Sequence, residues 1–122
     1  MSAMPAAHVI LATYNQLPYL RRTLRGYLRQ TSTDFHLTLA DDGSSDGTDA
    51  FAAEIAAAFA ERGIGFSHVT QADEGFRKAR IINEAVRRGP PAALLIVSDG
   101  DCLPPAAYVE RHLAAHEPMS FH

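Results

Sequence analysis

The chain has 122 residues, of which 47% are hydrophobic, so we expect a single domain over residues 1–122 with a substantial buried core. Its net charge of -3 and pI of about 6.0 give no overall field that attracts nucleic acid or an anionic membrane, so we expect no nucleic-acid partner. A single cysteine, the lack of an apolar stretch long enough to span a bilayer and the lack of a signal peptide predict a cytoplasmic protein, with docking to a membrane surface left open.

The N-terminal third of the chain predicts a strand, a helix and a second strand. Residues 8–13 (HVILAT) form a mostly apolar run typical of a buried strand, and residues 14–16 form the loop after it. In residues 35–39, apolar and polar side chains alternate, which predicts the second strand. Pro18 suits the first turn of the helix between them, whose apolar face follows from the helical spacing of Leu20, Leu24, Tyr27 and Leu28.

The middle of the chain repeats this alternation. Turn formers fill residues 41–48, and either Asp46 or Thr48 can cap the helix that follows. Arg62-Gly63 is expected to end that helix. Residues 65–70 then predict a short third strand, and residues 71–75 a polar loop.

A third helix, a fourth strand and a last helix complete the expected elements. Apolar positions within residues 79–86 mark the helix, and Gly89-Pro90-Pro91 breaks it. The fourth strand, residues 94–97 (LLIV), has no polar break, so we expect it to be buried on both faces. A final helix is expected from Tyr108 to near Pro118.

Strands that alternate with helices predict an α/β fold, a Rossmann-like parallel sheet with helices on both faces. We expect the first strand to lie between the second and the fourth, with the third strand outside the second. Open sheets of this class bind ligands where the strand order reverses. A crevice is therefore expected between the first and fourth strands.

Asp99 and Asp101 stand one residue apart directly after the fourth strand. Two like charges this close repel each other unless a cation or hydrogen-bond donors offset them. Mg²⁺ and Mn²⁺ prefer carboxylate oxygens, so either ion would suit the pair, and Gly100 between the two lets backbone or ligand approach closely. An isolated D-x-D is more often a solvated acidic turn, but the end of a buried strand favours a ligand site.

Polar loops follow three of the predicted strands, and in a parallel sheet all three lie along one edge. They carry the ring of Tyr14, the acidic run that begins at Asp41, and the turn at residues 99–101. Arg77 and Lys78, at the start of the third helix, approach the same edge. Acids that hold a metal, basic groups that meet phosphates and a ring that stacks on a base would together bind a nucleoside diphosphate. Each part alone fits a turn, a helix cap or a solvated surface, and only their coincidence indicates a site.

Other motifs fit less well. Neither G-x-x-x-x-G-K-[ST] nor G-x-G-x-x-G is present. A haloacid-dehalogenase-type phosphatase would carry its D-x-D on the first strand, whereas here the motif ends the fourth. A phosphoacceptor receiver domain would need the Asp41-Asp42 pair after the first strand instead of the second.

Four segments in combination resemble family 2 glycosyltransferases of the GT-A fold, in their N-terminal, nucleotide-sugar-binding half. The segments are VILATYNQLPYL, DFHLTLADDGSSDGT, QADEGFRKARIINEA and LLIVSDGDCLPPAAYVERHLAAHEP, and they cover nearly the whole chain in the family's order. The resemblance implies a hexosyltransferase-type enzyme that uses Mn²⁺ or Mg²⁺. It would transfer a sugar from a nucleotide-diphosphate sugar, with a UDP-sugar as our first expectation, to a glycan or other hydroxyl acceptor with inversion of configuration.

The resemblance also implies roles for individual residues. Tyr14 would lie beside the base, and Asp42 would contact the base or the ribose. Arg77 would lie near the base and phosphates, with Asn83 supporting that wall, and Asp99 would lie against the ribose and the metal. The full donor-nucleotide site would consist of Thr13, Tyr14, Asn15, Asp42, Arg77, Asn83, Asp99 and Gly100, and the metal ligands would be Asp101 and Asp99.

Members of the family usually continue for roughly another hundred residues, about the size of a small domain, with the acceptor pocket and an acidic general base. No residue of this chain matches that base, so we expect the donor-binding half of an enzyme, inactive or slow by itself. A non-catalytic nucleotide-sugar-binding module is the alternative. The fourth strand would then be an apolar sheet edge, which invites self-association, so a homodimer is one expected outcome.

Overall fold

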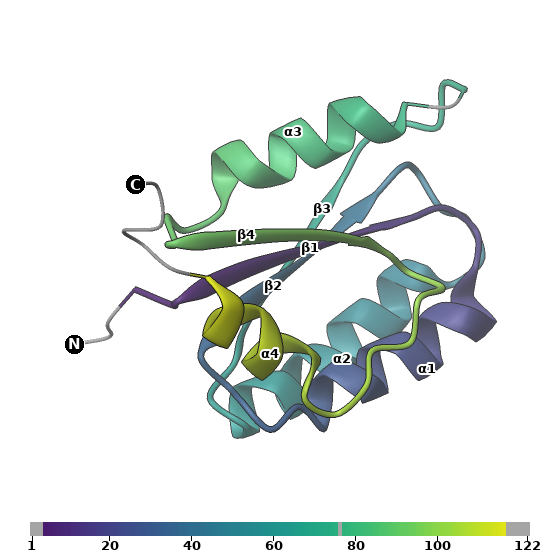
Figure 1. The fold of residues 1–122 in the computed structure, drawn as a ribbon. Coiled ribbons are helices and arrows are strands. Elements are labelled where there is room, and N and C mark those ends of the chain that lie inside the picture. Colours follow the sequence, from purple (N-terminus) through teal and green to yellow (C-terminus); the bar gives the residue numbers. More distant parts are fainter. Residues whose placement is uncertain (1–3, 76, 117–122) are drawn as a thin grey trace.

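A computed structural model describes residues 4–75 and 77–116, which form a four-stranded parallel sheet between two helical layers (Figure 1). The strand order is β3-β2-β1-β4, and each neighbouring pair is parallel. The predicted α/β class and strand order are confirmed. In chain order the elements are β1 (Ala7–Thr13), α1 (Leu17–Leu28), β2 (Phe35–Asp41), α2 (Thr48–Glu61), β3 (Gly65–Thr70), α3 (Lys78–Arg88), β4 (Leu94–Asp99) and α4 (Tyr108–Ala115).

The larger part of the core lies between the sheet and the layer of α1, α2 and α4 (Figure 1). Odd-numbered residues of the central strands, such as Leu11 and Leu39, face this layer and have no solvent exposure. Leu20 and Leu24 of α1 and Phe59 of α2 pack on them, as their helical spacing predicts. Full burial of such a side chain stabilises the fold by about 1.5–3 kcal/mol.

The opposite face of the sheet is covered by α3 (Figure 1). Ile81 and Ala85 of this helix pack on Ile10, Ala40 and Val69, one residue from each of the three strands beneath. Because both faces of β1 are covered, all seven of its residues are buried. The N-terminal end of α3 is thereby held above the carboxyl ends of β1 and β2.

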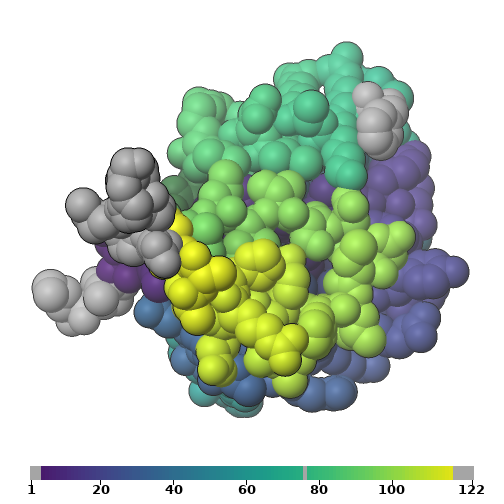
Figure 2. All heavy atoms as spheres, viewed as in Figure 1, coloured from purple at the N-terminus to yellow at the C-terminus, as the bar shows by residue number. Residues whose placement is uncertain are grey.

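The prediction that the fourth strand is buried on both faces is wrong. In β4 only Ile96 is buried, whereas Leu95 and Val97 are 47% and 49% exposed. The reason is its place in the sheet: among the described residues β4 pairs only with β1, and α3 packs mainly over the other three strands. Figure 2 shows side chains of β4 at the surface between α3 and α4.

Several element boundaries differ from the predictions. The second and fourth strands extend to Asp41 and Asp99, so these two carboxylates belong to strand ends. The N-cap of α2 is Gly47, in a left-handed conformation, rather than either predicted cap. The last helix ends at Ala115, and Pro118 lies outside the described residues. None of the helices in the described ranges is long and apolar enough to cross a bilayer.

Gln30 ties the segment between β4 and α4 to the end of α1. Its buried amide nitrogen donates to the carbonyl of Pro105 at 2.7 Å, and its amide oxygen accepts from the backbone N–H of Val109 at 2.9 Å. The N–H of Thr31 donates to the carbonyl of Ala106 at 2.9 Å. These bonds anchor the chain that leaves Asp101 along the surface of α1.

Two histidines occupy the α3 face of the sheet at the amino ends of the strands. His8 hydrogen-bonds to Thr38 at 2.7 Å, and its ring meets that of His36 edge-on, with 5.5 Å between ring centroids. Both rings need glycine neighbours: a Cβ at Gly89 would lie 2.1 Å from His8, and one at Gly65 would lie 2.3 Å from His36. Burial, together with the nearby His36, lowers the pKa of His8 from 6.5 to about 4.

We therefore predict that the fold weakens in mild acid. Unfolded His8 binds a proton near pH 6.5 but folded His8 only near pH 4, so its stabilising effect is complete above pH 6.5 and is lost as the pH falls toward 4. Linkage gives a loss of about 2 kcal/mol in unfolding free energy between pH 7.5 and pH 5, measurable by urea titration. His8→Gln should flatten this dependence, whereas His112→Gln, exposed on α4, should not. An equal pH dependence in the wild type and in His8→Gln would contradict the prediction.

Candidate functional site at the carboxyl edge of the sheet

A pocket of about 400 Å³ opens at the carboxyl ends of three strands, beside the first turn of α3. The crevice expected between β1 and β4 is present, and it extends further, to the end of β2. It is lined by Ala12, Thr13, Tyr14, Gln16, Ala40, Asp42, Lys78, Ile81, Asp99 and Asp101. Five of the nine residues predicted from the sequence, Thr13, Tyr14, Asp42, Asp99 and Asp101, therefore line one cavity.

Asp42 is a nearly buried carboxylate on the pocket wall, with 4% of its surface exposed. One carboxylate oxygen accepts from the side-chain amide of Gln71 at 2.8 Å, and the other from the backbone N–H of Arg77 at 2.9 Å. Gln71 also donates to the carbonyl of Arg77 at 3.0 Å. Donors from both ends of the β3–α3 connection thus fix the orientation of Asp42.

Tyr14, on the pocket wall, is hydrogen-bonded to the loop after β3. Its hydroxyl donates to Asp73 at 2.8 Å, and this bond, with some desolvation, raises the pKa of Tyr14. Gly43 lies under Asp73 with a φ of +84°, where a Cβ would come within 2.6 Å of the Asp73 nitrogen. Only glycine suits that conformation and that approach, so the loops after β2 and β3 pack closely beside the ring.

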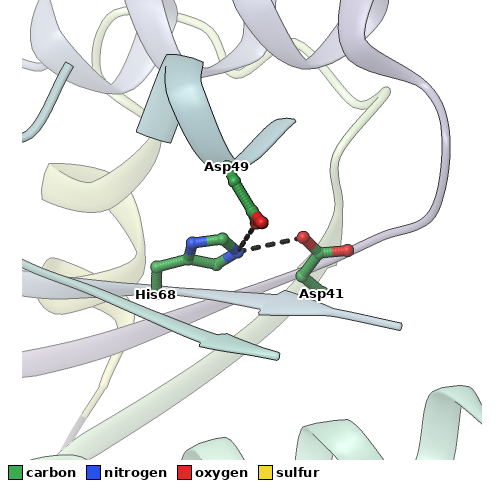
Figure 3. A group of neighbouring side chains, drawn as sticks. All are labelled: Asp41, Asp49 and His68. Atoms are coloured by element: carbon green, nitrogen blue, oxygen red, sulfur yellow. Dashed lines mark hydrogen bonds and ion pairs between the residues drawn. The ribbon is translucent and has the colours of Figure 1, made fainter. Parts of the chain in front are cut away.

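Asp41, next to Asp42, has no solvent exposure and faces the other way, toward α2. Figure 3 shows His68 of β3 between Asp41 at the end of β2 and Asp49 at the start of α2. His68 Nε2 donates to Asp41 at 2.9 Å and lies 3.8 Å from Asp49. Burial raises the pKa of Asp41, but hydrogen bonds from His68 and Ser44 outweigh it, so the pKa is lowered overall. The sequence analysis missed His68, whose only signal was its place on a strand next to Asp41.

Asn15 braces the loops instead of lining the pocket. Its backbone N–H donates to the hydroxyl of Ser44 at 2.9 Å, and its side-chain oxygen accepts from the N–H of Ser45 at 2.8 Å. Asp46 accepts from the N–H of Leu17 at 2.9 Å. The loop after β2 therefore holds the loop after β1 in place, and the backbone of Asn15 takes a positive φ of 45° to meet it.

Asp99 and Asp101 lie close together at the end of β4. Ligand atoms of Asp99, Asp101 and Cys102 all fall within 4.8 Å of one another. Lys78 Nζ lies 2.5 Å from one oxygen of Asp99, and both side chains are partly exposed. Gly100 is buried: its N–H donates to the carbonyl of Ala12 at 2.8 Å, and a Cβ there would lie 3.0 Å from the Gln16 side chain.

Two predicted residues have other surroundings in this structure. The side chain of Arg77 pairs with Glu74 at 3.3 Å, and Asn83 is exposed on α3, so neither lines the pocket. Thr13 does line it, and its buried hydroxyl has no hydrogen-bond partner among the described residues. A buried polar atom is rarely left unsatisfied, so this hydroxyl is available to a ligand or water.

Comparison with known proteins identifies relatives over nearly the whole chain. The family described as Glycosyl transferase family 2 matches residues 8–118. Validoxylamine A glucosyltransferase of Streptomyces hygroscopicus subsp. jinggangensis is 35% identical over 117 residues, which cover 94% of this chain and 26% of that protein. The chain thus spans about a quarter of the length of this relative.

Solved structures match the fold. The mannosyltransferase PcManGT of Pyrobaculum calidifontis, in complex with GDP-Man and Mn²⁺, superposes with a TM-score of 0.71 at 26% identity, over 86% of this chain and 30% of that one. S. aureus TarS 1-349, in complex with UDP-GlcNAc, superposes with a TM-score of 0.74 at 19% identity, over 88% and 30% respectively, a likeness of fold alone.

The environment of Asp41 generates a prediction about stability. In Asp41→Asn the amide oxygen can replace one acceptor but not both, so we expect a loss of about 1.5–3 kcal/mol in unfolding free energy, measured by urea titration at pH 7. Asp49→Asn is the matched control, because the same change is made to the exposed partner of the same histidine. It should cost less than about 1 kcal/mol. Equal losses of unfolding free energy in the two variants would show that the buried Asp41–His68 bond stabilises the fold no more than the exposed Asp49–His68 contact does.

Proposed function

This chain belongs to glycosyl transferase family 2, and we propose that residues 1–122 form the unit that binds a nucleoside-diphosphate sugar, whose sugar is then transferred to an acceptor hydroxyl. The observation that carries the proposal is the convergence of Tyr14, Asp42, Asp99, Asp101 and Lys78 on one pocket. An aromatic ring, fixed acceptors, a carboxylate pair and an ammonium correspond to the base, ribose, cation and diphosphate of such a donor.

In this proposal the nucleoside lies between β1 and β2. The exposed face of Tyr14 stacks on the base, and Asp42 accepts from a ring N–H or from ribose hydroxyls. The unpartnered hydroxyl of Thr13 gains a partner in the donor. Because Asp42 is already oriented by Gln71 and Arg77, little ordering cost attends its contact with the ligand.

The carboxylates of Asp99 and Asp101 fit a divalent cation. Their oxygens are near neighbours at a partly exposed site, and Mn²⁺ and Mg²⁺ are commonly held by one or two carboxylates with phosphate and water completing the shell. A cation held there would offset negative charge on the departing diphosphate. PcManGT was solved in complex with GDP-Man and Mn²⁺, which supports a divalent ion in this proposal.

We place the acceptor site and the general base outside residues 1–122. Three carboxylates line the pocket, and in this proposal each meets the nucleotide or the cation. Glu74 pairs with Arg77, and Glu110 accepts from Thr31 at 2.5 Å, so neither is directed to the pocket. During transfer the base removes the acceptor's hydroxyl proton, the oxygen bonds to the anomeric carbon, and the bond to the diphosphate breaks on the opposite side, which inverts the configuration.

A thermal-shift screen of UDP-, GDP- and dTDP-sugars, with and without Mn²⁺, tests the proposal. A ligand that binds only the folded state stabilises it by about 2.7 kcal/mol at a hundred times its Kd. We expect sugars of one base to raise the melting temperature, and more so with Mn²⁺ present. Absence of a shift with every donor in both conditions would refute donor binding by this chain.

Two variants separate the nucleoside and diphosphate ends of the site. Asp101→Asn should weaken Mn²⁺-dependent binding of UDP but leave metal-free binding of UMP nearly unchanged. Asp42→Ala should weaken both, with or without metal, by about 1.5–3 kcal/mol, as expected for a lost charged acceptor. Titration calorimetry measures both ligands, and Glu54→Gln, exposed on α2, controls for the charge change. Equal losses of UDP and UMP in Asp101→Asn would exclude its metal role, and unchanged UMP affinity in Asp42→Ala would leave that residue a structural part of the turn.

A further inference from the structure

Lys78 is the first residue of α3, and its ammonium lies 2.5 Å from an oxygen of Asp99 inside the pocket. We propose that Lys78 binds the donor diphosphate and, before the donor arrives, competes with the divalent cation for Asp99. The inference rests on the proposed function, which already pairs Lys78 with the diphosphate, and adds a second role for this residue at Asp99. It describes an exchange: the ammonium leaves Asp99 for the phosphates as the cation takes its place on the carboxylate.

The charges on the pocket wall support this exchange. Among the described side chains that line the pocket, Lys78 is the one basic group, against the carboxylates of Asp42, Asp99 and Asp101. Asp42 already accepts two N–H groups, and Asp101 is exposed to solvent. A diphosphate entering this pocket meets repulsion from three carboxylates, so the ammonium is the side chain on the wall that favours its entry.

The position of the Lys78 ammonium at Asp99 disfavours a divalent cation on the same carboxylate, so the two compete for it. An oxygen that holds an ammonium at 2.5 Å has a lone pair engaged and a positive charge beside it, and both disfavour a divalent ion there. Lys78 is 40% exposed on a flexible four-carbon stem, so it can turn from the carboxylate to a nearby phosphate. Asp99 keeps a counter-charge in either state.

The start of α3 strengthens the site for an anion. Within residues 4–75 and 77–116 no side chain caps this helix terminus, and Lys78 and Ile81 of its first turn line the pocket. Free N–H groups and the helix dipole at such a terminus attract phosphate. Arg77, the neighbouring cation, is committed elsewhere, because its side chain pairs with Glu74 and its backbone N–H with Asp42.

The test uses Lys78→Met, Lys78→Arg and a matched control, Arg80→Met, which removes the same charge from an exposed position of α3 outside the pocket lining. Binding of Mn²⁺ alone is followed by loss of the free-ion EPR signal, and binding of UDP and UMP by calorimetry with Mg²⁺. Circular dichroism checks that each variant remains folded.

The two roles predict changes of opposite sign. Lys78→Met should bind Mn²⁺ alone about threefold or more tightly, because the competing ammonium is gone. The same variant should bind UDP about tenfold more weakly, with a smaller loss for UMP, because a charged partner of the diphosphate is missing. Lys78→Arg keeps the charge and should restore UDP binding, and Arg80→Met should behave as wild type in both measurements.

Unchanged UDP affinity in Lys78→Met, or weaker Mn²⁺ binding, would overturn the inference. Equal effects of Lys78→Met and Arg80→Met would also overturn it, because the changes in affinity would then come from the loss of one positive charge anywhere on α3 and not from a contact of Lys78. A wild-type chain that binds none of UDP, GDP and dTDP overturns the proposed function and this inference together. Wild-type UDP binding that Lys78→Met leaves intact overturns this inference alone.

Discussion

Asp41 is a carboxylate buried without solvent contact, and its hydrogen bonds decide where both loops beside the pocket lie. An ionised group in such a place is costly unless donors surround it, and here the ring of His68 and the backbone of Ser44 supply them. Ser44 in turn accepts from Asn15, so one buried charge links β3, β2 and the loop after β1. The shape of the pocket wall follows from this requirement, because an unpaired Asp41 could not remain buried and charged.

Because side chains alternate along a strand, the adjacent acids Asp41 and Asp42 point to opposite sides of the sheet and have different partners. Asp41 continues the odd-numbered face of β2, which packs toward α2, whereas Asp42 turns to the other side, where the start of α3 and the pocket lie. Asp41 is closed to any ligand by its burial, and Asp42 is held open to one by Gln71 and Arg77. At the end of β4 the two acids stand two positions apart instead, and both Asp99 and Asp101 line the pocket, with Gly100 between them packed against the first loop.

Much of the fold could be predicted from the sequence because its signals are local. Alternation of strands and helices predicted the α/β class, and the strand order expected for the parallel sheet is confirmed. The predicted strand order already placed the fourth strand at the edge, but the exposure of Leu95 and Val97 was not predicted, because the apolar run does not show that α3 packs mainly over the other three strands. The partners of individual charges were equally hidden: whether Lys78 meets Asp99, or Arg77 meets Glu74, depends on side-chain placement across segments distant in sequence.

The hydrogen bonds of Gln30 to Pro105 and Val109 affect the order in which parts of the fold can form during synthesis. Gln30 lies in the first third of the chain, but its amide bonds Pro105 and Val109, 75 and 79 positions later. β4, which carries Asp99, likewise pairs with β1 across most of the chain. During vectorial synthesis the early strands and helices can assemble as they leave the ribosome, but the bond from Val109 that anchors the segment after the acidic turn forms only once Val109 has emerged. The edge of β1 that pairs with β4 therefore remains unpaired until residues 94–99 have been synthesised.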